Sequence, residues 1–390
     1  MNTGKIGNII KRYKDGLDLQ HNGMKFNVEM SFNKDTLKKK LQTICAEYEI
    51  KAQNASLEAT GHGFKIIKEK EGVTVDYDKT VEQLYTYVTE KWNKKANIKL
   101  TATTTVSKPK YTTEDCEKVS NEPMGSYTTE FSVGSSYANR NLNIQNGAKL
   151  INGAVVYPGE QYSCNENLYP WTEDNGWHPA GTYVDGGVQD SLGGGICQVS
   201  STLYNALLRA EIKVVKRFPH SMAVGYVPLS ADAALAGDYK DLVFENDTDA
   251  PIYVQGIYNS GGSITFNIYG HDTRKAGHSV KYESKTVKTT PVKTQTKKDS
   301  SKPVGYSEVE SSGHVGYVAE LWKITYENGK QVSKELIHTS TYAMSPTIVV
   351  KGTKKASTTT KKDDSDKDDK KSSEKTTKKS TSSKKSKKSE

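Results

Sequence analysis

The chain has 390 residues, enough for two or three domains, but only 34% of them are hydrophobic, and tyrosine (23) far outnumbers phenylalanine (7). Such a low apolar share predicts short strands, wet surfaces and a disordered portion rather than one large core. The net charge is +9, and the last 40 residues, with 15 lysines and 7 acidic residues, carry almost all of it. Because the remaining body is nearly neutral, we expect no nucleic-acid partner.

Two absences in the sequence bear on location and on cofactors. The sequence has no run of 18 apolar residues and no signal-peptide core at its start, which taken literally favours a cytoplasmic protein. The four cysteines, Cys45, Cys116, Cys164 and Cys197, are widely spaced, with neither a CxxC pair nor a histidine cluster beside them. That spacing argues against zinc, so we expect no metal and no other cofactor, and it leaves a Cys45–Cys116 disulfide open.

The first 110 residues have the pattern of a small α+β domain. Asn33 or Asp35 can cap a helix that runs to about residue 44, and a second helix follows residues 71–80. Strands are predicted at residues 55–59, 64–67 and 98–106. No residue types here have catalytic spacing, so we interpret residues 1–110 as a binding or spacing module.

The rest of the chain divides by composition into four further segments. Residues 111–130 lack periodicity and are interpreted as a linker, and residues 131–275 as a mixed α/β domain. Residues 281–353 alternate polar and β-branched residues and predict an all-β domain. The Lys/Ser/Thr-rich residues 354–390 cannot bury enough apolar surface to fold and should be disordered. The fold class is therefore α+β.

The mixed domain is predicted to place two helices among several short strands. The helices are expected at residues 141–151 and after the glycines at 193–195. Strands are predicted at residues 212–218, 223–227, 242–245, 252–257 and 263–269. Residues 164–191, rich in glycine and aromatic residues, are expected to be a long loop that builds a site.

Residues 193–212, GGGICQVSSTLYNALLRAEI, hold the strongest chemical signal. Apolar residues recur at helical spacing from Val199 onward, which puts Cys197 at the N-terminus of a helix. There, unpaired amides and the helix dipole favour an anion, and they can lower the pKa of a thiol and populate the nucleophilic thiolate. We favour a reactive thiol because a packing cysteine rarely follows three glycines; a buried structural cysteine is the alternative.

His220 and Asp232 are the candidate partners of this thiol. His220 ends the strand that follows the cysteine's helix, so that strand can bring it back beside the helix N-terminus as a general base. A half-buried histidine that donates to a backbone carbonyl is the alternative. Asp232 can orient the imidazole, a role that a backbone carbonyl can also fill, or it can cap a short helix in residues 231–237.

A further group of residues is expected to bind the substrate or an oxyanion. Its members are Gly194, Gly195, Gln198, Ser200, Ser201 and Arg140. Backbone amides of the glycine turn, or of Cys197 itself, can stabilise an oxyanion. The two serines can donate to substrate or serve the backbone of their own helix, and the arginine can pair with a substrate carboxylate or lie on the surface.

Several blocks of the mixed domain resemble the VanW family. They are YANRNLNIQNGAKLINGAVVYPGEQYS, GGGICQVSSTLYNALLRAEI, VVKRFPHSMAVGYV, SADAALAG, FENDTDAPIYVQG and FNIYG. They cover roughly residues 131–269, and GGGICQ and RFPHS are the most specific. Residues 1–110 resemble the YoaR-like peptidoglycan-binding domain that usually precedes VanW. Residues 281–353 resemble a G5 domain, a β-rich module associated with cell-wall and glycan binding.

The resemblance implies a function at the cell wall. Some VanW-domain proteins are regarded as L,D-transpeptidases, which join the third residues of neighbouring peptidoglycan stems. Cys197 would then be the nucleophile that accepts the acyl group, and His220 its base. The alternative is a non-catalytic peptidoglycan-binding adaptor linked to glycopeptide resistance, in which the glycine–cysteine turn only shapes a groove.

The same resemblance sets the expected partners and location. We expect binding to peptidoglycan stem peptides and glycan, with anionic wall polymers attracted weakly by the charged tail. Such proteins usually begin with a membrane anchor and a further binding repeat, and this sequence starts where a second repeat would start. We therefore expect an upstream anchor, a location at the extracellular face of the cell envelope, and poor covering of Ile6, Ile9 and Ile10.

Overall fold

The structure is a computed structural model that describes residues 5–23, 31–60, 63–92, 99–184 and 187–355. It divides into two compact units. One holds the described residues up to 294 together with residues 311–347, and the other holds residues 295–310 and those from 348 onward. The division falls inside the segment predicted to be all-β, so the two sheets of that segment belong to different units.

The N-terminal part contains the two helices and the strands near residues 55–59 and 64–67 that the sequence predicts, and also a helix, α1, and a strand, β3, that it does not. Its helices are α1 (Ile9–His21), α2 (Lys34–Cys45) and α3 (Tyr77–Thr86), with short turns η1 (Ala46–Tyr48) and η2 (Tyr87–Lys91). Its strands are β1 (Ser56–Thr60), β2 (Gly63–Ile67), β3 (Gly72–Val75) and β4 (Thr104–Ser107), paired as β1–β2 and β3–β4. Asn33 caps α2, because its side chain accepts a hydrogen bond from the Thr36 amide at 2.9 Å. The predicted strand at residues 98–106 starts later than expected, and its first residue lies outside the described residues.

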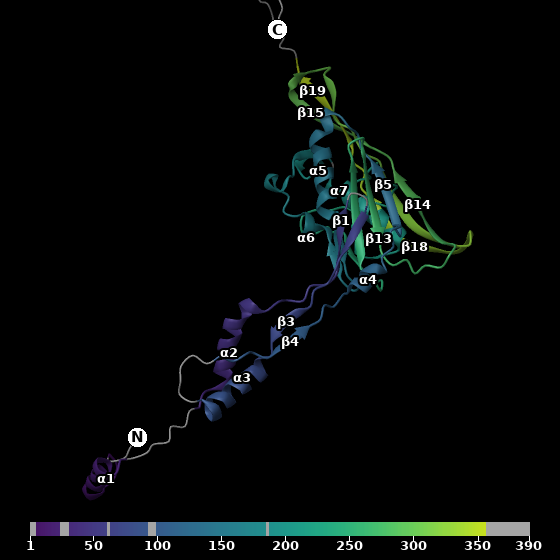
Figure 1. Ribbon diagram of the computed structural model, residues 1–390. Helices are drawn as coiled ribbons and strands as arrows, with labels where there is room; N and C mark the ends of the chain where they lie inside the picture. The colour runs from purple at the N-terminus through teal and green to yellow at the C-terminus, as the bar shows by residue number, and fades with distance from the viewer. Residues whose placement is uncertain (1–4, 24–30, 61–62, 93–98, 185–186, 356–390) are drawn as a thin grey trace, which may run out of the picture. The chain divides into compact units, whose positions relative to one another are not determined.

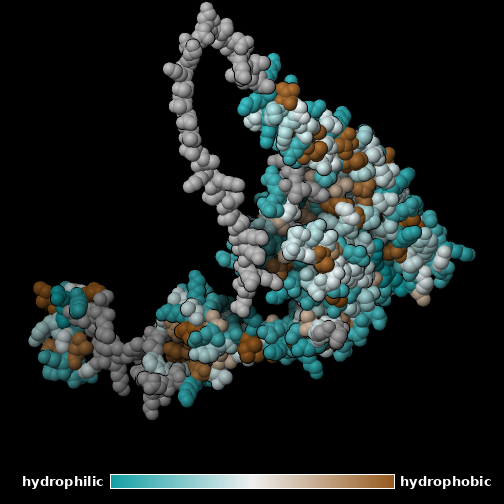
Figure 2. Space-filling model, turned by 90° about the horizontal axis from the view of Figure 1, so that it is seen from above, coloured by the Kyte–Doolittle hydropathy of each residue, from teal (hydrophilic) through white to brown (hydrophobic). Residues whose placement is uncertain are grey.

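Neither α1 nor α2 buries any of its residues. Ile9 and Ile10 of α1 are 83% and 68% exposed, in agreement with the poor covering expected for them, and Ile6 is exposed as well. The brown surface at the left of Figure 2 belongs to this helix. Within the described residues, no helix is both long and apolar enough to cross a membrane.

A larger α/β body follows. Its helices and turns are α4 (Thr113–Glu117), η3 (Ser135–Tyr137), α5 (Ala138–Ile151), α6 (Cys164–Leu168), η4 (Glu173–Asn175) and α7 (Ile196–Ala210). Its strands are β5 (Gly125–Glu130), β6 (Ala154–Val156), β7 (Gln161–Ser163), β8 (Pro179–Val184), β9 (Gly187–Leu192), β10 (Lys213–Lys216), β11 (Val243–Glu245), β12 (Ile252–Asn259) and β13 (Ser263–Tyr269). They form a four-stranded sheet in the order β5-β13-β12-β6, a three-stranded sheet in the order β10-β11-β7, and the β8–β9 hairpin.

Helix α7 is the centre of this body (Figure 1). It packs against β5 and β13, while α5 packs against β12. Its apolar residues Val199, Leu203 and Leu207 are fully buried, as the spacing predicts. Gly125 of β5 comes so close to the helix that an added Cβ would lie 2.3 Å from the Ala210 nitrogen. Because polar residues of α7 are buried too, the helix is enclosed on all sides rather than amphipathic.

Two segments predicted to be irregular contain helices and strands. Residues 111–130, interpreted as a linker, contain α4 and β5. Residues 164–191, interpreted as a long loop, contain α6 and the β8–β9 hairpin. Strand β5 pairs with β13, which lies more than 130 residues further along the chain; Thr128, for example, pairs with Thr265. A strand that is held by so distant a partner could not be predicted from the residues around it.

Two predicted elements are not formed. Residues 223–227 are not a strand, and residues 231–237 are not a helix. The second of these segments makes its hydrogen bonds elsewhere: the Ala233 amide donates to the Ser201 hydroxyl at 2.9 Å, and the Ala234 amide donates to the Phe218 carbonyl at 2.8 Å. Tertiary contacts therefore replace the helical hydrogen bonds that the composition suggests.

The all-β segment forms two three-stranded sheets. One holds β14 (His278–Thr290), β17 (Gly316–Glu327) and β18 (Lys330–Tyr342) in the order β14-β17-β18. The other holds β15 (Thr294–Pro303), β16 (Ser307–Ser311) and β19 (Thr347–Lys354) in the order β15-β19-β16. The fold class is thus α+β, as predicted. The predicted tail, residues 354–390, begins at the last residue of β19, Lys354, and residues 356–390 lie outside the described residues.

The β14-β17-β18 sheet shares a core with α7. Leu321 of β17 is 1% exposed and belongs to the apolar cluster that surrounds α7. The Tyr282 hydroxyl of β14 donates to the Leu208 carbonyl at 2.7 Å. Glu211, just past the end of α7, pairs with His278 at 2.7 Å and with Lys323 at 2.5 Å. This sheet is therefore packed against the helix that carries Cys197.

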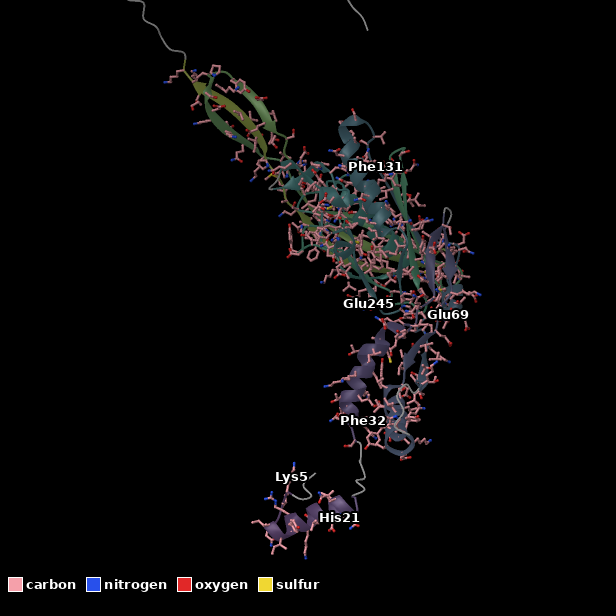
Figure 3. All side chains as sticks on the ribbon, turned by 60° about the vertical axis from the view of Figure 1, so that its left-hand side comes forward. Lys5, His21, Phe32, Glu69, Phe131 and Glu245 are labelled. Carbon is pink, nitrogen blue, oxygen red and sulfur yellow. The ribbon has the colours of Figure 1, made fainter. Side chains whose placement is uncertain are left out.

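A second apolar cluster connects β1 and β2 to the four-stranded sheet. Its buried members are Ala55, Leu57, Cys116, Val119, Tyr253 and Tyr269. The Tyr157 hydroxyl adds a hydrogen bond to the Ala55 carbonyl at 2.6 Å. Glu69, labelled in Figure 3, accepts a hydrogen bond from the Thr113 amide at 2.8 Å.

Candidate active site

The glycine turn before α7 is shaped by close backbone contacts. Gly193 and Gly195 have φ values of +83° and +111°, which glycine adopts far more easily than other residues. Gly194 lies so near β8 that an added Cβ would be 2.5 Å from the Ala180 carbonyl oxygen. The turn places Cys197 in the first turn of α7, as predicted, with a half-buried side chain.

The Cys197 sulfur lies against the backbone of Leu235. The Leu235 amide donates to Sγ at 3.4 Å, and the thiol can donate to the Leu235 carbonyl, 3.5 Å away. Among the described residues, the backbone amide of Cys197 itself has no acceptor, whereas the amide of Ile196 donates to Gly193 and that of Gln198 to Gly195. One N–H at this helix terminus therefore remains available to a substrate oxygen.

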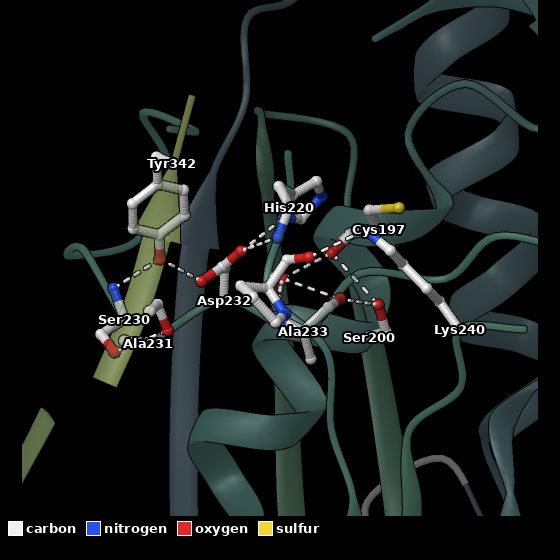
Figure 4. A network of polar contacts seen from close by, with 12 residues as sticks. Cys197, Ser200, His220, Ser230, Ala231, Asp232, Ala233, Lys240 and Tyr342 are labelled. Carbon is white, nitrogen blue, oxygen red and sulfur yellow. Dashed lines mark hydrogen bonds and ion pairs between the residues drawn. The ribbon is translucent and has the colours of Figure 1, made fainter. Parts of the chain in front are cut away.

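His220 and Asp232 form a tight pair beside this thiol (Figure 4). His220 Nδ1 lies 2.6 Å from Asp232 Oδ2, and the His220 backbone amide donates to the same oxygen at 2.7 Å. Since the carboxylate occupies Nδ1, Nε2 is the ring atom that can exchange a proton with the thiol. The Tyr226 hydroxyl lies 3.4 Å from Nε2.

The pKa values of the three groups favour an ion pair. Burial opposes the thiolate of Cys197, but the hydrogen bond and charge of His220 and the Leu235 amide outweigh it, so the pKa of Cys197 lies below its ordinary value. Burial also opposes the imidazolium, but hydrogen bonds to Asp232 and Cys197 raise the pKa of His220 to about 9. Although burial opposes its ionisation, the pKa of Asp232 lies far below its ordinary value because of His220 and Arg217.

Asp232 is buried, with 1% of its side chain exposed, and is held by two residues that the sequence analysis did not select. Arg217 Nη2 donates to Asp232 Oδ1 at 2.6 Å, and the Tyr342 hydroxyl donates to the same oxygen at 2.5 Å. Arg217 belongs to the RFPHS block, three residues before His220, so a scan for charged neighbours of the histidine would have found it. Tyr342 lies 110 positions from Asp232 and has no local signal.

A cavity of about 920 Å³ opens over the thiol and the imidazole. Cys197 and His220 line it, together with the aromatic side chains of Trp171 and Tyr226. Arg140 and Lys240 bring positive charge to its wall, and no carboxylate of the described residues lines it. The cavity therefore suits a ligand that carries negative charge. Within the described part of the chain, no cluster of His, Cys, Asp and Glu could hold a metal ion.

Three family models match the chain, one after another. The model described as "Putative peptidoglycan binding domain" matches residues 1–97, the one described as "VanW like protein" matches residues 139–269, and the one described as "G5 domain" matches residues 281–354. Residues 139–269 form a VanW-like domain. Together with its two neighbours, this domain indicates a cell-wall-associated protein.

Two curated relatives are similar over part of their length. The protein named "Uncharacterized protein YoaR" from Bacillus subtilis (strain 168) is 37% identical over 164 residues, which are 42% of this chain and 53% of that protein. The vancomycin B-type resistance protein VanW of Enterococcus faecalis (strain ATCC 700802 / V583) is 28% identical over 116 residues, 28% of this chain and 42% of that one. The chain thus spans about half the length of the relatives it matches.

Two solved structures are similar over about a fifth of this chain. The G5 domain of IgA1 protease is 30% identical, with a TM-score of 0.16, and the match covers 21% of this chain and 96% of that one. The crystal structure of HP0197-G5 is 23% identical, with a TM-score of 0.14, and the match covers 19% of this chain and 97% of that one.

Arg140 and Gln198 of the VanW-like domain contact each other beside the thiol. Arg140 Nη2 donates to Gln198 Oε1 at 2.7 Å. The Gln198 amide group donates in turn to the Thr129 hydroxyl at 2.9 Å and to the Glu130 carbonyl at 2.8 Å. Both residues line the cavity. The Gln198 side chain therefore holds the guanidinium of Arg140 at the cavity wall.

Ser200 and Ser201 serve the backbone, the alternative that the sequence analysis left open. Ser200 Oγ donates to the Ala233 carbonyl at 2.7 Å, and Ser201 Oγ donates to the Cys197 carbonyl at 2.7 Å. Neither serine lines the cavity. By holding Ala233 against α7, they fix the segment that carries Asp232 and Leu235. The alternative of Asp232 as a helix cap does not hold, because no helix follows it.

Two further observations concern residues outside the predicted site. Asn143 of α5 is fully buried and donates to the carbonyls of Gly194 at 2.8 Å and His178 at 2.9 Å, so it fixes the glycine turn. All four cysteines are free, so the Cys45–Cys116 disulfide that the sequence left open is not formed.

Selective alkylation of Cys197 is the first expected result. At pH 7 iodoacetamide should modify Cys197 of the VanW-like domain far faster than Cys164 or Cys116, because burial raises the pKa of both of those thiols. The pH dependence of the Cys197 alkylation rate should have a midpoint below the ordinary thiol pKa of about 8.5, since the thiolate persists to lower pH when the pKa is lowered. Peptide mass mapping across pH 5–10 measures it, with the half-exposed Cys45 as internal reference. A Cys197 midpoint at or above 8.5 would contradict the ion pair.

Proposed function

We propose that this chain is a cell-surface cysteine acyltransferase of the L,D-transpeptidase type, acting on peptidoglycan stem peptides. The observation that carries the proposal is the position of the Cys197 thiol, between the glycine turn and the His220–Asp232 pair and at the wall of a large cavity. A thiol, an imidazole and a carboxylate lie here in the order in which acyl-transfer enzymes use a nucleophile, a base and an orienting group, and this order supports the proposal.

In the first half-reaction, the thiolate attacks the carbonyl carbon of the third stem residue. A C–S bond forms, and the carbonyl oxygen takes the negative charge, which the free amide of Cys197 can stabilise. The intermediate then collapses, the C–N bond to the terminal D-alanine breaks, and the departing amine takes the proton from His220 Nε2. A thioester on Cys197 and free D-alanine result.

In the second half-reaction, a side-chain amine of another stem attacks the thioester. His220 Nε2 accepts a proton from this amine, an amide bond forms, and the C–S bond breaks to return the thiolate. Asp232 keeps the imidazole in one orientation and stabilises its charged form in both halves. Atoms and protons balance without a metal or an oxidant.

The charge of the cavity supports a stem peptide as substrate. A donor stem that ends in D-alanine carries a free carboxylate one residue from the bond that breaks. Arg140 and Lys240 line the cavity that contains Cys197, and Lys240 Nζ donates to the Pro219 carbonyl at 3.0 Å, next to His220. Guanidinium and ammonium groups bind carboxylates through charge-assisted hydrogen bonds.

The neighbouring modules support action on the wall itself. Residues 1–97 and 281–354, which match the models of peptidoglycan-binding and G5 domains, would hold the enzyme on stem peptides and glycan. The lysine-rich residues 354–390 would add a weak, salt-sensitive attraction to anionic wall polymers. The same two modules support a location at the extracellular face of the envelope. The similarity to a protein named for vancomycin resistance supports a link to glycopeptide resistance.

A defined muropeptide tests the proposal. Incubation of the chain with purified disaccharide tetrapeptide should give a thioester on Cys197 and a dimer that has lost one D-alanine, both detected by mass spectrometry. A tripeptide without dimer would show that water replaces the amine as acceptor.

The alternative function makes a different prediction for the same experiment. A non-catalytic adaptor linked to glycopeptide resistance would co-sediment with purified walls but would form neither the thioester nor the dimer. That pair of results would overturn the enzymatic proposal if it were obtained both with stem peptides whose side-chain carboxyl groups are amidated and with stem peptides whose side-chain carboxyl groups are free.

A further inference from the structure

Strand β18 lies in the segment that matches the G5 model, yet one of its faces reaches the candidate active site. His338, Ser340 and Tyr342 alternate along the strand, so their side chains share a face. All three form hydrogen bonds with the segment that leads to Asp232 or with Arg217, which also binds Asp232.

Ser230, two residues before Asp232, is the first point of contact. Its φ is +67°, a conformation that residues other than glycine rarely adopt and that persists only where the surroundings fix it. The Ser230 amide donates to the Tyr342 hydroxyl at 2.7 Å, and its hydroxyl lies 2.8 Å from that of Ser340. His338 Nε2 lies 2.7 Å from the Ser230 carbonyl. Burial and the charge of Arg217 lower the pKa of His338 to about 4, so this ring is neutral and Nε2 can donate.

Tyr342 is the second and more direct contact. Figure 4 shows its ring on β18 with the hydroxyl between Ser230 and Asp232. The hydroxyl accepts the Ser230 amide, so its own hydrogen points at Asp232 Oδ1. Oδ1 thus has two donors, Tyr342 and Arg217, and Oδ2 has two others, both from His220. The carboxylate is fully coordinated only when Tyr342 is present.

We propose that Tyr342 is a positioning residue for the Cys197–His220–Asp232 site, so the G5-matched segment completes the active site instead of serving only to bind the wall. Tyr342 does not line the cavity and acts through Asp232. Without its hydroxyl, Oδ1 keeps one donor, the carboxylate can turn, and the Oδ2 bond to His220 Nδ1 weakens. The consequence for turnover rests on the proposed function, whereas the consequence for the thiol does not.

The test uses the full chain carrying Cys45→Ser, so that Cys197 is the only cysteine that is not buried. Its variants are Tyr342→Phe and, as matched control, Tyr282→Phe. Tyr282 lies in the same sheet and donates to the Leu208 carbonyl of α7, so the control removes a comparable hydrogen bond without touching Asp232. For each variant, the pH dependence of Cys197 alkylation by iodoacetamide is measured, followed by kcat and KM on disaccharide tetrapeptide.

The groups that face the imidazole fix the sign of the expected shift. They are Cys197, Asp232 and Tyr226, with Arg217 behind the carboxylate. When the Asp232 carboxylate can turn, it stabilises the His220 imidazolium less. The Cys197 thiolate, which pairs with that imidazolium, then forms only at a higher pH. Tyr342→Phe should move the alkylation midpoint up by about half a unit or more and lower kcat about tenfold with KM unchanged. Tyr282→Phe should do neither.

An alkylation midpoint that stays unchanged or falls in Tyr342→Phe would overturn the proposal. An equal rise of the midpoint in Tyr282→Phe would also overturn it, because the effect would then come from the packing of the sheet. A shifted midpoint in a chain that never turns over muropeptides would leave the positioning role standing while the proposed reaction fails. If Tyr342→Phe does not fold, Ser340→Ala takes its place. It removes the hydroxyl that contacts Arg217 and Ser230 and should shift the midpoint in the same direction.

Discussion

Cys197→Ala is expected to form no thioester and no third-to-third cross-links, a loss of at least about 1000-fold in kcat. Alanine keeps the backbone of the glycine turn and of α7 but removes the atom that attacks the carbonyl. The sulfur forms hydrogen bonds with the Leu235 backbone and with His220, which keeps its bonds to Asp232 in the variant, so we expect the free energy of unfolding to fall by about 1 kcal/mol or less. Mass spectrometry of muropeptides from cells that produce the variant measures the cross-links.

Cys45→Ala is the control for this variant, because Cys45 is also a free cysteine but lies on α2, away from the cavity. It should retain full activity. Cross-links that persist undiminished in Cys197→Ala, in cells that lack the unmodified chain, would exclude the thiol as nucleophile. Wall binding, measured by co-sedimentation, should be the same in all three chains.

Asp232→Asn is expected to lower kcat by about 100-fold to 10,000-fold. Asparagine is neutral, so the imidazolium loses its counter-charge, and the pKa of His220 falls back from its raised value. The imidazole of His220 then carries its charge over a narrower pH range and stabilises the Cys197 thiolate less. The alkylation midpoint of Cys197 should therefore move to higher pH. The buried Arg217 loses its ion-pair partner as well, which should cost about 3 kcal/mol or more in the free energy of unfolding.

A second histidine–aspartate pair supplies the control for Asp232→Asn. Asp249 Oδ1 lies 2.8 Å from His271 Nδ1, an arrangement of the same kind on the surface. Asp249→Asn should leave kcat and the alkylation midpoint unchanged. Stopped-flow assays at a temperature where both variants remain folded, checked by circular dichroism, separate lost catalysis from lost structure. An Asp232→Asn chain with more than a tenth of the original kcat would contradict the orienting role.

Local sequence signals were sufficient wherever a residue's environment is built by its own neighbours. Three glycines before an apolar helical pattern indicated the turn and α7, and the Asn33 cap indicated α2. His220 was selected because it ends the strand that follows the helix of Cys197, and its expected return beside Cys197 agrees with the geometry, since both residues line one cavity. These features depend on backbone preferences within a few residues, which the amino-acid types express directly.

The rest of the site depends on contacts between distant segments. The role of Asp232 could not be separated from that of a helix cap, since only the His220 and Arg217 contacts show which it takes. Strand β5 was hidden because its partner β13 follows far along the chain. The contribution of Tyr342 was hidden for the same reason, because nothing around it in β18 differs from an ordinary polar strand.

The shared core between α7 and the β14-β17-β18 sheet has an evolutionary consequence. Modules of multidomain proteins can be exchanged by recombination when each folds and works alone. Here Leu321 is buried among residues that surround α7, and Tyr342 binds Asp232. In a recombinant that joined this VanW-like domain to a foreign G5 module, the apolar residues around α7 would lose the side chains that cover them. The Asp232 carboxylate would lose the hydrogen bond from Tyr342. We therefore expect the two segments to be inherited together, with the point of exchange lying before residue 125 or within the second sheet.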